Sequence, residues 1–219
     1  MTCCVMLLDV QSPVKKSAGN ALLDVACGTG KHLLYLKPRY GVEGLDIDSQ
    51  MLNAARSQQP YVHFQQGNML DFQLDRKFDA IICLFSAIGY AKTVSNLGLA
   101  VQTMERHLAS GGVLIVEPWF GPESFYAGTV HSVIVGDPQL KIARMNVSQV
   151  EGNLSILDFH YLVGTPQGIE YFTERHELGL FTNEQYLSTF AQAGLETTSD
   201  PPDLLGWTLH MGRTKDEAE

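Results

Sequence analysis

The residues best suited to chemistry form a glycine-rich turn after a short apolar run. The run Ala21–Val25 leads into Ala26-Cys-Gly-Thr-Gly30, and a helical pattern follows. Gly28 and Gly30 allow positive φ angles and a close approach of the backbone to a ligand. The first N–H groups of the following helix have no partners within it, so they can bind a carboxylate or a phosphate. We therefore expect a small molecule with such a group to bind here, with an ordinary glycine-rich turn as the alternative.

Two ligand classes use such a turn, and two residues of this chain distinguish between them. A dinucleotide fingerprint requires a third small residue where this chain has Leu33. Asp24 can accept a hydrogen bond from an ammonium group, which S-adenosylmethionine has and NAD lacks. The motif therefore predicts S-adenosylmethionine as the cofactor and disfavours an NAD-dependent oxidoreductase. The residues expected around the cofactor are Asp24, Ala26, Gly28 and Gly30.

Polar residues after the next two apolar runs suit the rest of a nucleoside. Asp46 closes the second run, where a carboxylate can accept hydrogen bonds from both ribose hydroxyls, with Asp48 as the competing residue. Asn68 follows the third run and can accept from the adenine amino group through its side-chain oxygen. Met51 is placed to pack against the adenine, with core packing as the alternative. The order of these signals along the chain strengthens each of them.

The elements that must position these residues alternate between strands and helices. Apolar runs predict five strands, at 21–25, 42–47, 62–65, 78–84 and 113–116. Helices are expected at 31–36, from Ser49 as a cap, and at 94–108. Strands and helices in this order predict right-handed βαβ units and an open parallel sheet. Ligands of such sheets bind beyond the carboxyl ends of the strands, where the residues above are expected to lie.

The pattern changes after Pro118 to four strand-like segments separated by glycine- and proline-containing turns. These segments are 132–135, 141–150, 154–163 and 169–180, and they predict an antiparallel meander. A helix at 183–192 follows, with Thr182 and Gln185 placed as a capping box and Gly194 at its end. Two closing strands are expected, at 195–198 and 207–212.

The predicted fold class is therefore α/β, a doubly wound, mostly parallel Rossmann-like sheet with an inserted antiparallel β meander. We expect a single domain over 1–219, with a cofactor-binding half at 20–117. The meander at 118–181 would cover the substrate, and a closing helix and strands would occupy 182–213.

Composition limits the other function classes. The chain has 219 residues, of which 45% are apolar and 18% charged, and its formal net charge is −9. Its Lys and Arg residues form no cluster, which disfavours a nucleic acid substrate. No apolar run reaches the roughly 18 residues of a membrane-spanning helix. The four cysteines lack metal-ligand spacing, so no metal and a reducing, cytoplasmic location are expected.

With these motifs in order, the chain resembles class I methyltransferases. It is most similar to the amino-sugar N,N-dimethyltransferases of macrolide biosynthesis, of the desosamine and mycaminose type. The resemblance runs from about Leu22 to Leu195. The segments that carry it are 22–30, Phe85-Ser-Ala-Ile-Gly-Tyr90, Glu117-Pro-Trp119, His160-Tyr-Leu-Val163 and Leu180-Phe-Thr-Asn-Glu-Gln-Tyr186.

The resemblance implies methyl transfer from S-adenosylmethionine to a small-molecule acceptor, an amine such as that of an amino sugar. It places Met69 beside Asn68 at the adenine, and Leu84 and Phe85 beside the sulfonium. Tyr90 matches the position that faces the acceptor amine. It is the candidate catalytic residue, to take a proton or to orient the amine, with an aromatic cap over the cofactor as its alternative.

The resemblance also implies an acceptor pocket that Glu117, Trp119 and the meander enclose. His176, on the last meander strand, belongs to this pocket or is an ordinary half-buried strand residue. An exposed edge of the meander makes a homodimer plausible. No membrane or nucleic acid partner is expected.

Three departures from the family pattern keep alternatives open. Family members carry Asp at the position of Asn68, a longer segment before the first strand, and a Gly- and Arg-containing segment where this chain has 201–206. The short N-terminal segment supports one alternative, a truncated, non-catalytic homologue that binds S-adenosylmethionine poorly. The other alternative is an O- or C-methyltransferase of another small metabolite on the same scaffold.

Overall fold

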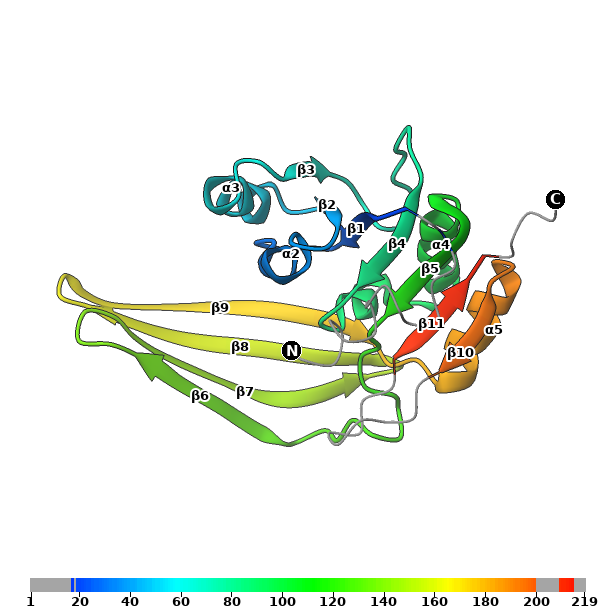
Figure 1. Cartoon of the computed structure of the whole chain (residues 1–219). Helices are drawn as coiled ribbons and strands as arrows, with labels where there is room; N and C mark the ends of the chain where they lie inside the picture. Colours follow the sequence, from blue (N-terminus) through cyan, green and yellow to red (C-terminus); the bar gives the residue numbers. More distant parts are fainter. Residues whose placement is uncertain (1–16, 18, 200–208, 215–219) are drawn as a thin grey trace.

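A seven-stranded sheet forms the centre of the protein, of which a computed structural model describes residues 17, 19–199 and 209–214 (Figure 1). The strand order is β10-β11-β5-β4-β1-β2-β3. Five of these strands are parallel: β1 (Ala21–Val25), β2 (Gly41–Asp46), β3 (His63–Gln66), β4 (Phe78–Cys83) and β5 (Leu108–Val116). Strand β11 (His210–Arg213) is antiparallel to both of its neighbours, β5 and β10 (Glu196–Ser199). The predicted doubly wound, mostly parallel sheet is therefore confirmed.

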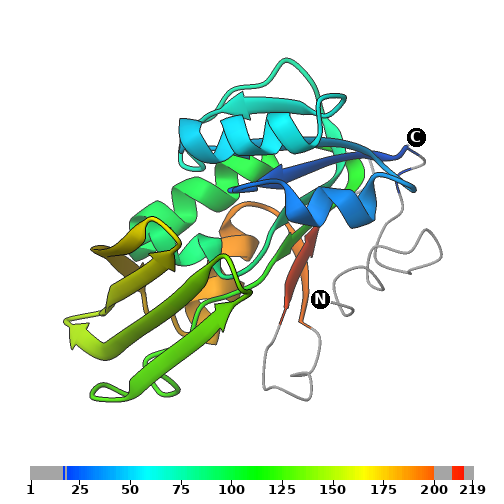
Figure 2. The same ribbon diagram turned by 90° about the vertical axis from the view of Figure 1, so that its left-hand side faces the viewer.

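Helices cover both faces of this sheet, which explains why its central strands are apolar throughout (Figure 2). Leu23, Ile81 and Leu114 face α4 (Val94–Glu105) and α5 (Asn183–Gln192) in one core cluster. Their neighbours along the strands, such as Leu22 and Ile82, pack against α2 (Lys31–Leu36) and α3 (Ser49–Gln58) in the other. Each fully buried Leu or Ile contributes about 1.5–3 kcal/mol of burial free energy, which holds the strand ends in place.

The caps of two helices agree with one sequence prediction and contradict another. Thr182 and Gln185 form the predicted capping box, in which each side chain accepts from the other residue's backbone N–H. The predicted cap at Ser49 is wrong, because Asp48 accepts from the N–H groups of Gln50 and Met51. Asp48 has extended φ and ψ angles and is therefore the N-cap, so the first helical residue is its neighbour Ser49.

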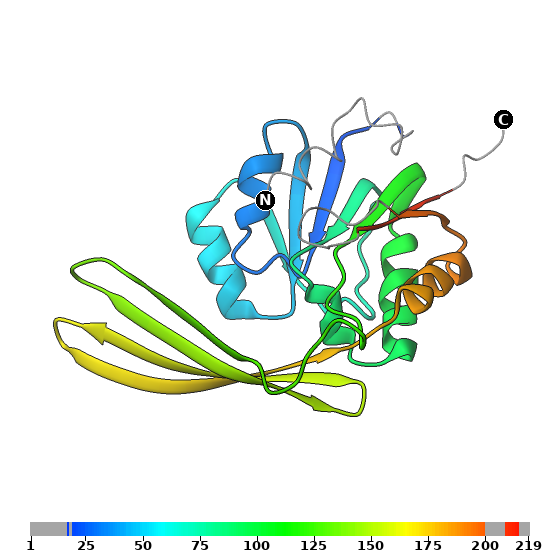
Figure 3. The same cartoon turned by 90° about the horizontal axis from the view of Figure 1, so that it is seen from below.

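A second sheet of four antiparallel strands lies between β5 and α5 in the chain, as predicted. Its strands are β6 (Val130–Gly136), β7 (Lys141–Glu151), β8 (Leu154–Thr165) and β9 (Gly168–Gly179), paired in that order. Figures 1 and 3 show this sheet extending past the carboxyl ends of the parallel strands. The ammonium of Lys92 is 2.8 Å from the Glu177 carboxylate of β9, which fastens the second sheet to the first.

Several boundaries differ from the expectations. Helix α4 ends at Glu105 instead of 108, because β5 already begins at Leu108. A 3₁₀ helix, η1 (Ala87–Ala91), was not predicted and positions Tyr90. The family departures expected before the first strand and at 201–206 lie outside the described residues, except for residues 17, 19 and 20. Within the described ranges, no helix has the length and apolarity needed to cross a membrane.

Candidate active site at the carboxyl ends of the strands

The parallel register brings most of the sequence-predicted residues to one edge of the large sheet. Asp24 of β1 lies beside Gly44 of β2 and Ile82 of β4, and Ile82 in turn pairs with Ile115 of β5. The segments that follow β1, β2, β4 and β5 therefore emerge side by side. This edge is where an open α/β sheet binds its ligands.

The turn after β1 has the backbone that the sequence predicts. Gly28 and Gly30 have φ angles of 55° and 71°, and Ala26 has 59°, which is unusual for a residue with a Cβ. A Cβ on Gly28 would meet nothing within 4 Å, so the backbone at Gly28 is open on that side. At Gly30 a Cβ would lie 2.9 Å from the Gln59 amide nitrogen, which donates to the Gly30 carbonyl. Gln59 therefore supports the turn at Gly30, whereas the turn is open to a ligand at Gly28.

Asp46 joins this turn to the end of β2. One carboxylate oxygen accepts from the Gly28 N–H at 2.7 Å, and the other accepts from the Asp48 N–H at 2.8 Å. Each oxygen keeps a second lone pair. The carboxylate is therefore held in one orientation and can still accept from the hydroxyls of a ligand.

Asp24 is the least satisfied polar group of the site. It is 1% exposed, and neither carboxylate oxygen has a hydrogen-bond partner among the described residues. Nδ1 of His32 is 3.6 Å from Oδ2, and the two groups form an ion pair when the imidazole is protonated. Burial raises the pKa of Asp24, which His32 partly opposes, and Asp24 raises the pKa of His32 in return. Such a buried carboxylate is costly by itself and fits a ligand that brings an ammonium group.

The turn after β4 is held in an uncommon conformation by the end of β5. Phe85 and Ser86 have φ angles of 55° and 60°. The Phe85 N–H donates to the Glu117 carboxylate at 2.9 Å, and the Ser86 hydroxyl donates to the Pro118 carbonyl at 2.8 Å. Phe85 is 83% exposed, whereas its neighbour Leu84 is buried. Two positive φ angles in a row at a strand end are typical of functional sites.

The residues predicted for the adenine lie around the start of α3 and the turn after β3. Met51 is 42% exposed, so its alternative role in core packing does not hold. The Asn68 side-chain oxygen accepts from the Leu70 N–H at 3.0 Å, which leaves one lone pair. Met69 is half-buried against the core.

The acceptor-side residues come from three separate elements. The Tyr90 hydroxyl of η1 is 2.5 Å from Nδ1 of His176 on β9. Trp119, after β5, donates from its indole nitrogen to the Ser155 hydroxyl of β8 at 2.8 Å. These two polar contacts, together with the Lys92–Glu177 ion pair, join the second sheet to the edge of the first. Glu174, whose carboxylate is 3.5 Å from Nε2 of His176, was not identified from the sequence. The two residues are two positions apart on β9, so the alternation of side chains along a strand would have placed them on the same face.

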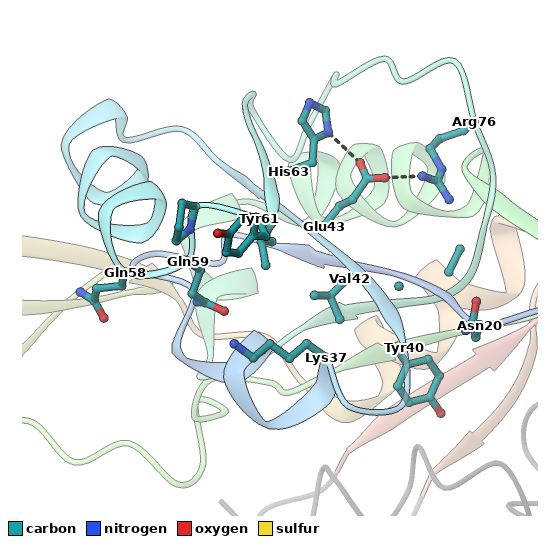
Figure 4. Close-up of a pocket in the computed structure, with 14 residues that line it drawn as sticks. Asn20, Lys37, Tyr40, Val42, Glu43, Gln58, Gln59, Tyr61, His63 and Arg76 are labelled. Atoms are coloured by element: carbon teal, nitrogen blue, oxygen red, sulfur yellow. Dashed lines mark hydrogen bonds and ion pairs between the residues drawn. The ribbon is translucent and has the colours of Figure 1, made fainter.

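A separate depression of about 700 Å³ lies toward the amino end of β2 (Figure 4). Glu43 stands between His63 Nδ1, at 3.1 Å, and the Arg76 guanidinium. None of the sequence-predicted site residues lines it. It is therefore distinct from the edge that carries the predicted site.

Comparison with known proteins identifies relatives of the whole arrangement. A family described as "Methyltransferase domain" matches residues 22–112. A dTDP-3-amino-3,4,6-trideoxy-alpha-D-glucopyranose N,N-dimethyltransferase from Streptomyces venezuelae is 41% identical over 178 residues, which is 80% of this chain and 75% of that protein. The crystal structure of Streptomyces venezuelae DesVI has a TM-score of 0.85 and 38% identity, covering 90% of this chain and 84% of that one.

A second similar structure contains bound cofactor. It is that of S-adenosylmethionine-bound CalS10, an amino pentose methyltransferase from Micromonospora echinaspora, with a TM-score of 0.82 and 38% identity. The similarity covers 90% of this chain and 84% of that one. The ligand bound in that structure is the cofactor that the sequence motif predicts for this chain.

Proposed function

This chain belongs to the family of S-adenosylmethionine-dependent methyltransferases that contains the sugar N,N-dimethyltransferases, and we propose that it methylates the amine of a nucleotide-linked amino sugar. The observation that carries the proposal is Asp24, a buried carboxylate without a donor, at the position where this family's cofactor needs an acceptor for its ammonium group. The 41% identity to a dTDP-amino-sugar N,N-dimethyltransferase supports the choice of acceptor.

Residues at this edge of the large sheet would hold four parts of the cofactor. Asp24 and the turn 26–30 would hold its amino-acid end, and Asp46 would hold the ribose. The adenine would lie among Met51, Asn68 and Met69. Leu84 and Phe85 would flank the sulfonium. S-adenosylmethionine, when bound, supplies a methyl group on a good leaving group, which a nucleophile displaces in line.

The carboxylates at this edge favour a cationic ligand. The charge of Asp46 contributes to the raised pKa of Asp24, and Glu117 contributes to the raised pKa of His32, so the groups act on one another through space. Three carboxylates, those of Asp24, Asp46 and Glu117, therefore lie near the single imidazole of His32. A sulfonium and an ammonium both gain from this negative potential.

Tyr90, Glu117, Trp119 and His176 would enclose the acceptor under the second sheet. An amine attacks only as the free base, and burial in a pocket lowers the pKa of an amine. The chain's main contribution is to hold the nitrogen close to the transferred carbon. The division into a cofactor half at 20–117, a cover at 118–181 and a closing part at 182–213 belongs to this proposal.

The test is a mass-spectrometric assay with S-adenosylmethionine and dTDP-3-amino-3,4,6-trideoxyglucose. We expect products with one and two added methyl groups. The matched acceptor, with a hydroxyl in place of the amine, is expected to stay unmodified. Methylation of the hydroxyl compound instead would favour the O-methyltransferase alternative. Calorimetry without detectable S-adenosylmethionine binding would favour the non-catalytic alternative.

We also propose a homodimer formed through the outer face of the second sheet, the face opposite the one that meets Tyr90. Ile134, Ala143, Leu162 and Tyr171 are successive cross-strand neighbours on this outer face. Ile134, Leu162 and Tyr171 are 75%, 48% and 60% exposed, and such an apolar row on a monomer marks an interaction site. Sedimentation of Leu162→Glu is expected to give monomers, whereas Tyr61→Glu at a fully exposed position away from this face is the control.

A cytoplasmic location belongs to the same proposal. Cys27 and Cys83 are free buried thiols, which agrees with a reducing compartment. A test is fractionation of the source cells, with the protein expected among the cytoplasmic proteins.

A further inference from the structure

Three polar side chains on the acceptor side form a continuous chain. The Tyr90 hydroxyl lies 2.5 Å from Nδ1 of His176, and Nε2 of the same ring lies 3.5 Å from the Glu174 carboxylate. Glu174 and His176 are two positions apart on β9, so both project from the face that meets η1. Phe159 of the adjacent strand packs edge-on against the imidazole at 5.1 Å, which limits the ring's rotation.

The direction of the hydrogen bonds follows from the state of Tyr90. Burial, with a smaller effect of the Glu174 and Asp46 carboxylates, raises the pKa of Tyr90 above its ordinary value. The phenol is therefore protonated at neutral pH and donates to Nδ1 of His176. The imidazole hydrogen is then on Nε2, facing Glu174. The three groups thus form a chain of polar contacts from Tyr90 through His176 to Glu174. Tyr90 is the end of the chain that a ligand can reach, because it is 46% exposed.

We propose that Tyr90, His176 and Glu174 form a proton relay that deprotonates the acceptor nitrogen between two successive methyl transfers. The inference rests on the proposed function, since it needs an amine acceptor that is methylated twice. The first transfer converts the amine into an ammonium ion, which has no lone pair. A second transfer at the same nitrogen requires the loss of one proton.

The proton moves through two linked steps. The N–H bond of the ammonium breaks and its electron pair remains on nitrogen, while the proton passes to the Tyr90 oxygen. At the same time the Tyr90 O–H bond breaks, and that proton passes to Nδ1 of His176. Tyr90 ends as the neutral phenol, and His176 ends as an imidazolium whose Nε2–H faces Glu174. The imidazolium later releases its proton to water.

The surroundings of the pair suit a transient positive charge. The titratable and charged groups around it are Glu174 from β9, Tyr161 from β8, Arg144 from β7, Lys92 after η1 and, acting on Tyr90 through space, Asp46 from β2. Arg144 lies over the Phe159 ring at 4.5 Å, and the Lys92 ammonium is paired with Glu177. Glu174 is thus the anion placed to stabilise the imidazolium, and we assign it and His176 as positioning residues for Tyr90.

Substitution of His176 separates the relay from simple positioning. The amide of His176→Asn can place an oxygen near the position of Nδ1, so it can still accept from Tyr90, but it cannot take up a proton. We expect the rate of the second methyl transfer to fall about 100-fold, within the range of general acid–base catalysis. The first transfer changes little, because the amine enters as the free base. The monomethyl product therefore accumulates.

Two further variants and two controls make the assay specific. Tyr90→Phe and Glu174→Gln are expected to shift the products in the same direction, Glu174→Gln less strongly. The first control is Glu170→Gln, because Glu170 projects from the same face of β9 but is farther from Tyr90. The second control is His63→Asn, which removes an imidazole that is paired with Glu43. Both controls are expected to keep the wild-type product ratio. Circular dichroism confirms the folding of each variant.

The pH profile and NMR give readouts that a structural role would not change. In the wild type the ratio of dimethyl to monomethyl product falls as the pH is lowered, because an imidazolium cannot accept a proton. This dependence is lost in His176→Asn. Nitrogen-15 NMR is expected to show the Nε2–H tautomer of His176 in the wild type.

The outcomes are distinguishable from those of the proposed function. Wild-type protein that methylates no amine refutes both. Wild-type protein that dimethylates its acceptor, with an unchanged product ratio and pH profile in His176→Asn, refutes the relay alone. An Nδ1–H tautomer of His176 in the wild type also overturns it.

Discussion

At the scale of single residues, the site is built from polar groups that are incompletely satisfied by the protein. Asp24 accepts no hydrogen bond among the described residues, whereas Asp46 accepts two from the backbone. The difference has a physical meaning, because a buried carboxylate without donors costs folding free energy that a cationic ligand can offset. Asp46 instead stabilises the fold and the site together. Asp24 is therefore the better position for testing function separately from stability.

Asp24→Asn tests the ammonium acceptor. We expect the Kd for S-adenosylmethionine to rise about 10- to 100-fold, since a hydrogen bond to a charged group contributes about 1.5–3 kcal/mol. The melting temperature without ligand is expected to stay the same or to rise, because the buried charge is removed. Isothermal titration calorimetry and thermal denaturation measure the two effects. The control is Asp75→Asn, at an exposed position, which should leave the Kd unchanged. An unchanged Kd in Asp24→Asn would refute the role of Asp24 as the ammonium acceptor.

At the scale of elements, short local structures determine where the site residues lie. The 3₁₀ helix η1 carries Tyr90 toward β9, and the turn after β4 carries Phe85 outward on a backbone held by Glu117. Helix α5 supports this region, because its Tyr186 is buried against Phe181, which follows the last strand of the second sheet. The second sheet is thus anchored where the capping box of α5 begins.

Thr182→Ala tests how much the capping box contributes. The Thr182 side chain accepts from the Gln185 N–H at 3.2 Å, and its loss leaves that donor without a protein partner. We expect the free energy of unfolding to fall by about 1 kcal/mol, with little change in cofactor affinity. Urea denaturation gives the first value and calorimetry the second. Ser188→Ala, in the middle of the same helix, is the matched control and should change stability less.

At the scale of the whole molecule, the C-terminal strand closes the large sheet and places a histidine in its core. His210 pairs with Val116 of β5 and stacks on the Tyr186 ring at 4.6 Å. It is 3% exposed, and burial lowers its pKa to about 4. The neutral imidazole is therefore part of the packing between α5, β5 and β11.

This burial predicts a loss of stability in mild acid. The unfolded state binds the His210 proton near pH 6.5 and the folded state near pH 4. Between these values the unfolded state holds more protons, so the free energy of unfolding decreases as the pH falls. The decrease is on the order of 3 kcal/mol for this residue. His210→Phe keeps the stacked ring and removes the titration.

Urea denaturation of both proteins at several pH values checks this prediction. The wild type is expected to lose more stability between pH 6.5 and 4 than His210→Phe does. Equal losses in the two proteins would show that other groups are responsible. The comparison isolates His210 because the two proteins share all their carboxylates.

The sequence by itself determined the cofactor class and the order of the elements. The turn at 26–30, Asp24 and the alternation of apolar runs are local in the chain, so their meaning can be derived without knowing the fold. The bounds of α2 and α5 and the capping box at Thr182 were predicted correctly for the same reason. The motifs after Leu84 gained their meaning from a family resemblance.

Only the tertiary structure decided how residues distant in the chain combine. Tyr90 and His176 are 86 positions apart, and Phe85 and Glu117 are 32 apart, so no local pattern could predict either hydrogen bond. The exposed fraction of Met51 and the missing partners of Asp24 depend on packing against distant segments. Local propensity determines where a strand or helix forms. The packing of distant side chains determines which polar groups remain available to a ligand.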